Sequence, residues 1–516
     1  MTIFFSPFKK NIDSLIAAIA GFILVLILTS HSGIGISPDS IMYTSVARNF
    51  HAGKGWFDFT QKPLVDFPIF YPTFLSVFIY IFHTDVLQFA PILNATLFAL
   101  VIFFSGYIIE QFIRTSKWYK WALLSIIAFS PSLLEIYTML WSETLFILLT
   151  LLFFITIKKY YTTQHYLTII ILGLIAATAT ITRYAGITLL ATGILVLLTN
   201  FSLHWYKRGM HIVLFVAISF FIPYANIVRN VFLTGNLAGN RLKGNMGIDM
   251  NISYFGSVIF NWFSGSTTQY ILTIIVGLII LFGPIIVYLQ QIESKKYALS
   301  YEKILTAFFL VYSNFIVISS TLSRYETINN RLLSPAYIPF ILVFSHTIPY
   351  YRIPYWVKRE KNRKINTIIH AAIMLALFIG FQYYQYKTNA ETYNNIKDDG
   401  IPGYAEDVWK NSPIVHFIQT DTLLNKHYQK TYSNQNYAVY LFTGYGTETI
   451  PEKVRTEQVE KFYTDKEYYI IWFFTDENPD LLTIDDIKKH TQIKQIKRFE
   501  DGAIYYCNNN ITTIKP

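Results

Sequence analysis

Charged residues are scarce in this chain, and cysteine is almost absent. Of its 516 residues, 14% are charged and 53% are hydrophobic, whereas about 25% charged residues is usual in soluble domains. So little charge excludes an ordinary soluble protein and indicates a chain that spans a membrane several times. The single cysteine, Cys507, cannot form an internal disulfide, and its surroundings in the sequence indicate a buried strand residue.

The formal net charge of +10 does not indicate nucleic-acid binding. The whole excess of Lys and Arg lies before residue 384, between apolar segments, and no basic groove with interleaved aromatic residues accompanies it. Basic loops between apolar segments follow the positive-inside rule, by which Lys and Arg mark the cytoplasmic side. We therefore expect membrane lipid, and no nucleic acid, as a partner.

The apolar segments predict about eleven transmembrane helices with the N-terminus inside. They lie near residues 14–30, 91–113, 121–140, 143–157, 167–181, 184–200, 210–227, 269–290, 303–320, 336–350 and 365–383. This topology places the basic loops in the cytoplasm, including the dense cluster at residues 352–364. A twelfth span at residues 68–82 would reverse the loops after it, so we expect this stretch to be a helix lying in the membrane interface.

Two domains follow from this pattern. Residues 1–383 form the transmembrane domain, in which residues 31–90 are a long first external loop with two surface helices. Residues 384–516 have a soluble pattern and form a small α/β domain outside the membrane. Its strands are predicted from Thr431 onward, at 468–474 and at 503–507, and its helices at 412–424, 436–444 and 483–490.

The predicted outer face collects acids and arginines from distant parts of the sequence. Asp39 follows the first span, and Glu143 begins the fourth. Arg183 and Arg331 lie where spans end or begin. Each residue also has a purely structural interpretation, because acids cap helix N-termini and arginines anchor helix ends to lipid phosphates.

Five stretches, in order along the chain, resemble segments of bacterial GT-C glycosyltransferases. They are "SPDSIMYTSVARNFHAGKGW", "PIFYPTFLSVF", "FSPSLLEIYTMLWSETLFILLTLLFF", "TRYAGITLL" and "NNRLLSPAYIPF". In pattern they are most similar to family 39-like members, the group of protein O-mannosyltransferases and the lipid A aminoarabinose transferase. The resemblance covers the whole membrane part and implies a GT-C fold.

The resemblance also implies a substrate and a site. The donor would be a polyprenyl-phosphate-linked sugar, used on the outer face of the cytoplasmic membrane, and the acceptor hydroxyl would belong to a lipid, a glycan or a protein. Asp39 matches the catalytic acidic residue of the first external loop, and Glu143 matches a second acidic position, so both are candidate catalytic residues. Many members have an Asp-Glu pair where this chain has Asp39-Ser40. Phe67 stands where several relatives have a lysine near the donor phosphate, and Lys62 is the nearest replacement.

The chemistry of such a transfer assigns the roles. A carboxylate, here Asp39, takes the proton of the attacking hydroxyl, and attack opposite the phosphate inverts the anomeric carbon without a covalent intermediate. The departing phosphate gains negative charge, so positioned cations at Arg183 and Arg331 stabilise the transition state more than the ground state. The remaining candidates are Lys62 for the donor phosphate and, for substrate binding, Arg48, Tyr71 and Tyr184.

Other readings stay open. The outer loops contain no His/Cys cluster and no Asp-x-Asp pair, so we expect no obligatory metal and no cofactor.

The main alternative is a transporter or flippase of lipid-linked glycans without transferase activity. Transporters hold ionisable groups near the membrane midplane, whereas Asp and Glu almost avoid the spans here. A third alternative is a non-catalytic scaffold, which would tolerate replacement of Asp39 by Asn.

Overall fold

A computed structural model describes residues 11–113, 115–239, 241–264, 269–324, 326–347, 363–420, 430–475 and 478–509. It contains two compact units. The membrane unit comprises Met1–Ile34 and Leu64–Asn395, and the C-terminal unit comprises Gly35–Pro63 and Ile396–Pro516. The bounds differ from the predicted division between residues 383 and 384, because part of the first external loop groups with the C-terminal residues. Most of the basic cluster predicted to be cytoplasmic, residues 352–362, lies outside the described residues.

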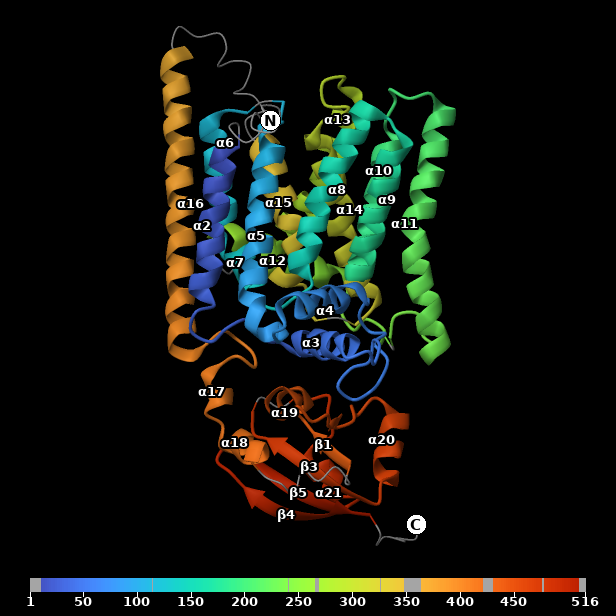
Figure 1. Ribbon diagram of the computed structural model, residues 1–516. Coiled ribbons are helices and arrows are strands. Elements are labelled where there is room, and N and C mark those ends of the chain that lie inside the picture. The colour runs from blue at the N-terminus through green and yellow to red at the C-terminus, as the bar shows by residue number, and fades with distance from the viewer. Residues whose placement is uncertain are drawn as a thin grey trace. The chain divides into compact units, whose positions relative to one another are not determined.

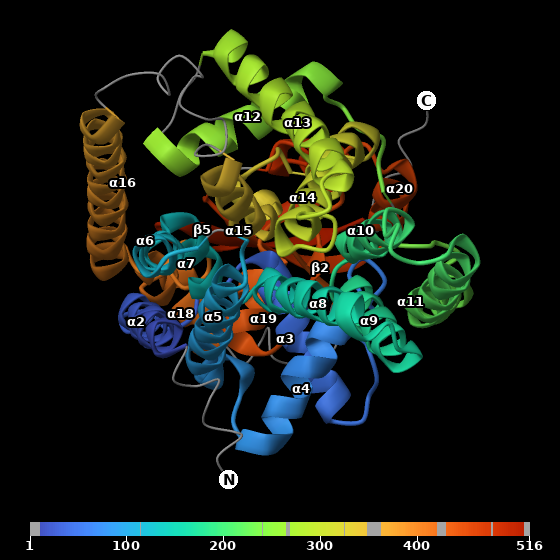
Figure 2. The same cartoon turned by 90° about the horizontal axis from the view of Figure 1, so that it is seen from above.

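The membrane unit is built from long helices that follow the predicted spans. They stand side by side in Figure 1 and are seen nearly end-on in Figure 2. Their bounds are α2 (Ile12–Leu28), α5 (Val86–Glu110), α6 (Lys117–Ala128), α7 (Pro131–Thr138), α8 (Glu143–Thr163), α9 (Tyr166–Thr182), α10 (Ile187–Leu198), α11 (Trp205–Thr234), α13 (Tyr270–Glu293), α14 (Tyr301–Leu322), α15 (Asn330–Thr347) and α16 (Arg363–Asp399). The chain is therefore a helical multi-pass membrane protein, as predicted.

Helix length and composition identify fewer spans among the described residues than the eleven predicted. Among the described residues, five helices are long and apolar enough to cross a membrane, and α6 with α7, bent by 46°, makes a sixth. The helices α2, α9 and α10 are apolar but shorter. The count of eleven stays a prediction.

Helix α4 (Phe70–Phe82) matches the predicted interfacial helix and lies across the ends of the long helices (Figure 1). Tyr71, Leu75 and Ile79, at helical spacing, are buried on one face, while Tyr80 and Phe82 are exposed. Such a one-sided apolar pattern is typical of a helix that lies on the membrane surface rather than through it.

One helix of the membrane unit was not predicted. Residues 228–268 were taken as an external loop, but α12 (Ile248–Ser264) occupies much of it and packs on α13. Gly256 permits this contact, because a Cβ atom there would lie 1.9 Å from the carbonyl oxygen of Thr273. The polar residues Asp249, Asn251 and Asn261 interrupt the spacing of apolar residues that indicates a helix, so the sequence did not predict α12.

The C-terminal unit contains a five-stranded mixed sheet of order β2-β1-β3-β5-β4. The strands are β1 (Lys430–Ser433), β2 (Glu448–Thr449), β3 (Glu467–Phe473), β4 (Gln492–Arg498) and β5 (Gly502–Asn508), and the helices are α17 (Asp407–Lys410), α18 (Pro413–Thr420), α19 (Asn436–Thr443), α20 (Thr456–Thr464) and α21 (Ile484–Lys488). β1 is parallel to β2 and β3, whereas β5 is antiparallel to β3 and β4. The predicted α/β class is confirmed, and β2, β4, α17 and α20 are additions.

The first external loop supplies a helix, α3 (Pro38–His51), to the C-terminal unit. The backbone nitrogen of Tyr404 donates to the carbonyl oxygen of Ile36 at 2.8 Å. The ring of Phe59 stacks on that of Tyr440, with centroids 4.7 Å apart. Gly446 allows the loop to approach, because a Cβ atom there would lie 2.2 Å from the carbonyl oxygen of Phe59. These contacts explain why Gly35–Pro63 belongs to this unit.

Candidate active site

Three of the predicted site residues meet in the membrane unit around one carboxylate. Oε1 of Glu143 forms an ion pair with Nη1 of Arg183 at 2.6 Å and accepts a hydrogen bond from Nε of Arg331 at 2.6 Å. The side chain of Glu143 is fully buried, while those of Arg183 and Arg331 are 16% and 12% exposed. The two guanidinium groups thus lie between a buried carboxylate and the surface of the unit.

Each of the three residues stands at the end of a different helix. Glu143 is the first residue of α8, Arg183 follows the last residue of α9, and Arg331 is the second residue of α15. Ser142 precedes α8 without making a side-chain cap. The capping interpretation of Glu143 is therefore incomplete, since its carboxylate pairs with arginines from two other helices.

A glycine fixes the direction of Arg183. After Arg183, which has extended backbone angles, the chain turns through the short 3-10 helix η1 (Tyr184–Gly186) into α10. A Cβ atom on Gly186 would lie 2.4 Å from backbone atoms of Ala179 and Thr180. Only glycine fits this close return of the chain, so the sequence "TRYAG" holds the arginine at the end of α9.

Trp141 and Ser142 complete the arrangement, and the sequence reasoning missed both. The guanidinium carbon of Arg331 lies 4.4 Å from the centre of the Trp141 ring, within the range of a cation–π contact. Nη1 of Arg183 donates to Oγ of Ser142 at 3.1 Å. Both residues directly precede Glu143 in "LWSETLF", and this adjacency was the available signal.

The two tyrosines proposed for substrate binding also lie in the membrane unit. Tyr71 of α4 is fully buried and lies close to Thr144, the residue after Glu143. The hydroxyl of Tyr184 donates to the carbonyl oxygen of Val65 at 3.0 Å and accepts from Nδ2 of Asn230 at 3.2 Å. Tyr71 therefore lies beside the cluster of Glu143, Arg183 and Arg331, here called the Glu143 cluster. The hydroxyl of Tyr184 instead binds the backbone of the segment that precedes α4.

The other candidates belong to the C-terminal unit. Asp39 lies, half-buried, in the first turn of α3. The structural interpretation of Asp39 as a helix cap is wrong, because the helix starts at Pro38 and Ser37 forms a capping box with Ser40. Arg48 donates to the hydroxyl of Tyr440 at 3.4 Å.

Lys62, predicted to bind the donor phosphate, has an acidic neighbour in the same unit. Its Nζ lies 2.6 Å from Oε2 of Glu448.

Among the described residues, no three His, Cys, Asp or Glu side chains gather where they could hold a metal ion.

Comparison with known proteins gives matches only at the level of structure. No family model matches the chain, and no curated protein matches it in sequence. The crystal structure of ArnT from Cupriavidus metallidurans in the apo state matches with a TM-score of 0.55 and 12% identity, covering 97% of this chain and 98% of that chain. The structure of the same protein bound to undecaprenyl phosphate matches with a TM-score of 0.57 and 11% identity, over the same shares of the two chains.

This chain has the fold of ArnT. The predicted architecture, a helical multi-pass membrane part followed by a C-terminal α/β part, is thereby confirmed. At 11% and 12% identity the likeness extends to the fold alone, and it does not single out family 39.

Proposed function

We propose that this protein transfers a sugar from a polyprenyl-phosphate donor to an acceptor hydroxyl. The observation that carries the proposal is the convergence of Arg183 and Arg331 on the buried carboxylate of Glu143, each at 2.6 Å. Each guanidinium group has five N–H donors, so the contact with Glu143 does not use all of them. A phosphate on a lipid carrier suits this pair of arginines, because guanidinium groups bind phosphate through paired N–H donors.

The reaction increases the charge on that phosphate. The donor is a phosphodiester with one negative charge, and the departing polyprenyl phosphate approaches two. Arginines that are already positioned therefore stabilise the transition state more than the bound donor. Losing one such donor group typically costs about 3 kcal/mol, or on the order of a hundredfold in rate.

Glu143 serves this reaction as a positioning residue. Oε1 of Glu143 forms an ion pair with Nη1 of Arg183 at 2.6 Å and accepts a hydrogen bond from Nε of Arg331 at 2.6 Å. Its role is to fix the two guanidinium groups so that little reorganisation is needed when the phosphate gains charge.

Asp39 is the proposed general base. The attacking hydroxyl oxygen forms a bond to the anomeric carbon, the bond from that carbon to the phosphate oxygen breaks with its electron pair leaving on the phosphate, and Asp39 takes the hydroxyl proton. Inversion in one step needs a single base. The assignment rests on the match of Asp39 to the acidic residue of GT-C first loops, and because Ser37 caps α3 the carboxylate of Asp39 is not required for that cap.

The likeness to ArnT supports the donor class. One ArnT structure holds undecaprenyl phosphate, the type of carrier that the arginines suit here. By the charge pattern of the loops, the reaction takes place on the outer face of the cytoplasmic membrane of a bacterial cell envelope.

The test is donor turnover by the purified full-length protein. Radiolabelled undecaprenyl-phosphate sugars are supplied with several sugars, and release or transfer of label is followed for the wild type, Asp39→Asn and Asp485→Asn. Asp485 is the matched control, because its side chain is 84% exposed and lies in the same unit.

We expect turnover in the wild type and Asp485→Asn and none in folded Asp39→Asn. Equal turnover in all three would remove Asp39 as the base, and binding of donor without turnover of any sugar would favour the transporter or flippase.

A further inference from the structure

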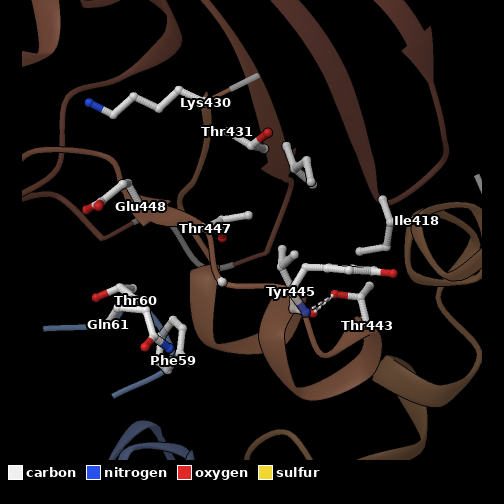
Figure 3. Close-up of a pocket in the computed structure, with 13 residues that line it drawn as sticks. Phe59, Thr60, Gln61, Ile418, Lys430, Thr431, Thr443, Tyr445, Thr447 and Glu448 are labelled. Carbon is white, nitrogen blue, oxygen red and sulfur yellow. Dashed lines mark hydrogen bonds between the residues drawn. The ribbon is translucent and has the colours of Figure 1, made fainter. Parts of the chain in front are cut away.

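The C-terminal unit contains a cavity that the proposed donor chemistry does not use. Its volume is about 360 Å³, within the range that small ligands occupy. Residues 59–61 of the first external loop form one wall, and side chains from β1, α18 and the turn between α19 and β2 form the others (Figure 3). All of these residues belong to one compact unit.

The walls of the cavity are held in place by close contacts. Gly446, in the turn that lines it, lies so close to Phe59 that a Cβ atom would be 2.2 Å from the Phe59 carbonyl oxygen. Gln61 adopts a left-handed backbone conformation with φ 61°, which is unfavourable for a residue other than glycine and often marks functional sites. These contacts hold Gln61 at the edge of the cavity, where its side chain offers an amide group.

A buried hydroxyl in the wall has no partner within the described structure. Thr447 is 6% exposed, lines the cavity, and its Oγ1 has no hydrogen bond among the described residues. Buried polar groups are nearly always hydrogen-bonded, and leaving one unsatisfied costs about 1–3 kcal/mol. A ligand in the cavity that can donate or accept a hydrogen bond would satisfy this hydroxyl.

The charges around the cavity are balanced in pairs. Glu448, in the wall, lies 2.6 Å from Nζ of Lys62. The side chain of Lys430 extends away from the other lining residues (Figure 3), and its Nζ lies 2.8 Å from Asp465. Paired charges favour a neutral ligand over an anion such as a phosphate.

The remaining lining chemistry consists of hydroxyls, an amide and aromatic surface. Thr60, Gln61 and Phe59 stand on one side of the space, while Thr443 and Tyr445 stand on another (Figure 3). Hydroxyl and amide groups both donate and accept hydrogen bonds. An aromatic ring offers an apolar face, to which a tyrosine adds a hydroxyl. A sugar ring, with many hydroxyls and apolar C–H faces, matches this mixture.

We propose that this cavity binds a sugar residue of the acceptor, so that the acceptor is a glycan or a glycosylated lipid. The unit that carries the cavity also carries Asp39, the proposed base for the acceptor hydroxyl. The acceptor role rests on the proposed transferase function, whereas sugar binding by the cavity does not.

The first experiment measures binding alone. Full-length protein in lipid nanodiscs is titrated with methyl glycosides of hexoses and N-acetylhexosamines and with their disaccharides, by saturation-transfer NMR and calorimetry. A serine- and threonine-rich peptide is the competing probe. We expect saturable binding of at least one saccharide and none of the peptide.

Three variants tie the binding to the cavity. Gln61→Gly removes the amide and suits the positive φ, so it folds at least as well as the wild type. Thr447→Val removes the hydroxyl and keeps the shape. Each lowers affinity about three- to tenfold, the loss expected for one hydrogen bond. Thr464→Val, an exposed threonine of α20 in the same unit, leaves affinity unchanged.

The outcomes separate this proposal from the transferase function. Absence of saturable saccharide binding, binding that neither cavity variant weakens, or binding of the peptide alone would each overturn the proposed sugar site. Saccharide binding that the cavity variants weaken supports the site even in a protein that turns over no donor. Where donor turnover is present, Gln61→Gly and Thr447→Val are expected to leave release of sugar to water unchanged and to raise the concentration of acceptor needed for transfer.

Discussion

Nε of Arg331 donates to Oε1 of Glu143 at 2.6 Å across 188 positions of sequence. Glu143 is fully buried and Arg331 is 12% exposed, so the contact joins the beginning of α15 to the beginning of α8 where little water screens it. Trp141 lies against the same guanidinium group, 4.4 Å from its carbon. The side chain of Arg331 thus has one defined orientation before any ligand arrives.

Replacing Glu143 by Gln should both destabilise the protein and reduce turnover. The variant leaves Arg183 and Arg331 close together without the carboxylate between them, and breaking a buried ion pair in this way costs about 3 kcal/mol. Thermal unfolding followed by tryptophan fluorescence measures the stability, and donor release measures the rate. Glu326→Gln is the control, because Glu326 is 47% exposed and 3.8 Å from Arg331, so its loss should cost less than about 1 kcal/mol. Equal stability of the two variants would contradict the positioning role.

Replacing Arg183 or Arg331 by Lys should lower donor turnover on the order of a hundredfold each. A lysine keeps the charge, but its single ammonium group cannot hold Glu143 and present paired donors to a phosphate together. Donor release by folded protein is the measurement. Arg208→Lys is the control, since Arg208 lies over the ring of Phe201 at 5.1 Å and away from the cluster. A loss below about threefold in both variants would show that these arginines do not act on the phosphate.

Much of the fold could be predicted because its signals are local. Apolar runs gave the long helices, and the turn residue Gly444, with φ 77°, ends α19 where the sequence indicated. Thr483 forms a capping box with Asp486 at the start of α21, also as the sequence indicated. The strands β2 and β4 were missed because β2 has two residues and β4, "QIKQIKR", is an exposed, strongly charged strand at the edge of the sheet.

The site could be predicted only in part because its geometry is not local. Glu143, Arg183 and Arg331 were each singled out, but nothing in the sequence showed that both arginines share one oxygen of Glu143. That arrangement depends on how α8, α9 and α15 pack. The membership of residues 35–63 in the C-terminal unit depends in the same way on contacts over long separations, such as Lys62 with Glu448.

Replacing Gly186 by Ala should be strongly destabilising and should misplace Arg183. The added Cβ would lie 2.4 Å from backbone atoms of Ala179 and Thr180, so the backbone itself must move, at a cost of about 3 kcal/mol. Thermal unfolding and donor release check the prediction together. Gly209→Ala is the matched control, because a Cβ atom at Gly209 in α11 meets nothing within 4 Å. Alanine there favours the helix by up to about 1 kcal/mol, and similar behaviour of the two variants would show that the turn after α9 has room.

The thiol of Cys507 should be unreactive in the folded protein. Cys507 is fully buried in β5, and burial raises the pKa of its thiol from 9.0 to about 12. The thiolate is the reactive form, so the native protein should not react with Ellman's reagent at pH 8, and the unfolded chain should release one equivalent. Between pH 9 and pH 12 the unfolded state loses this proton while the folded state keeps it, so this residue lowers the free energy of unfolding as pH rises. The variant Cys507→Ala should therefore lose less stability than the wild type between pH 9 and pH 12. In the test with Ellman's reagent, rapid labelling of the native protein at pH 8 would contradict the prediction and show that β5 opens to solvent.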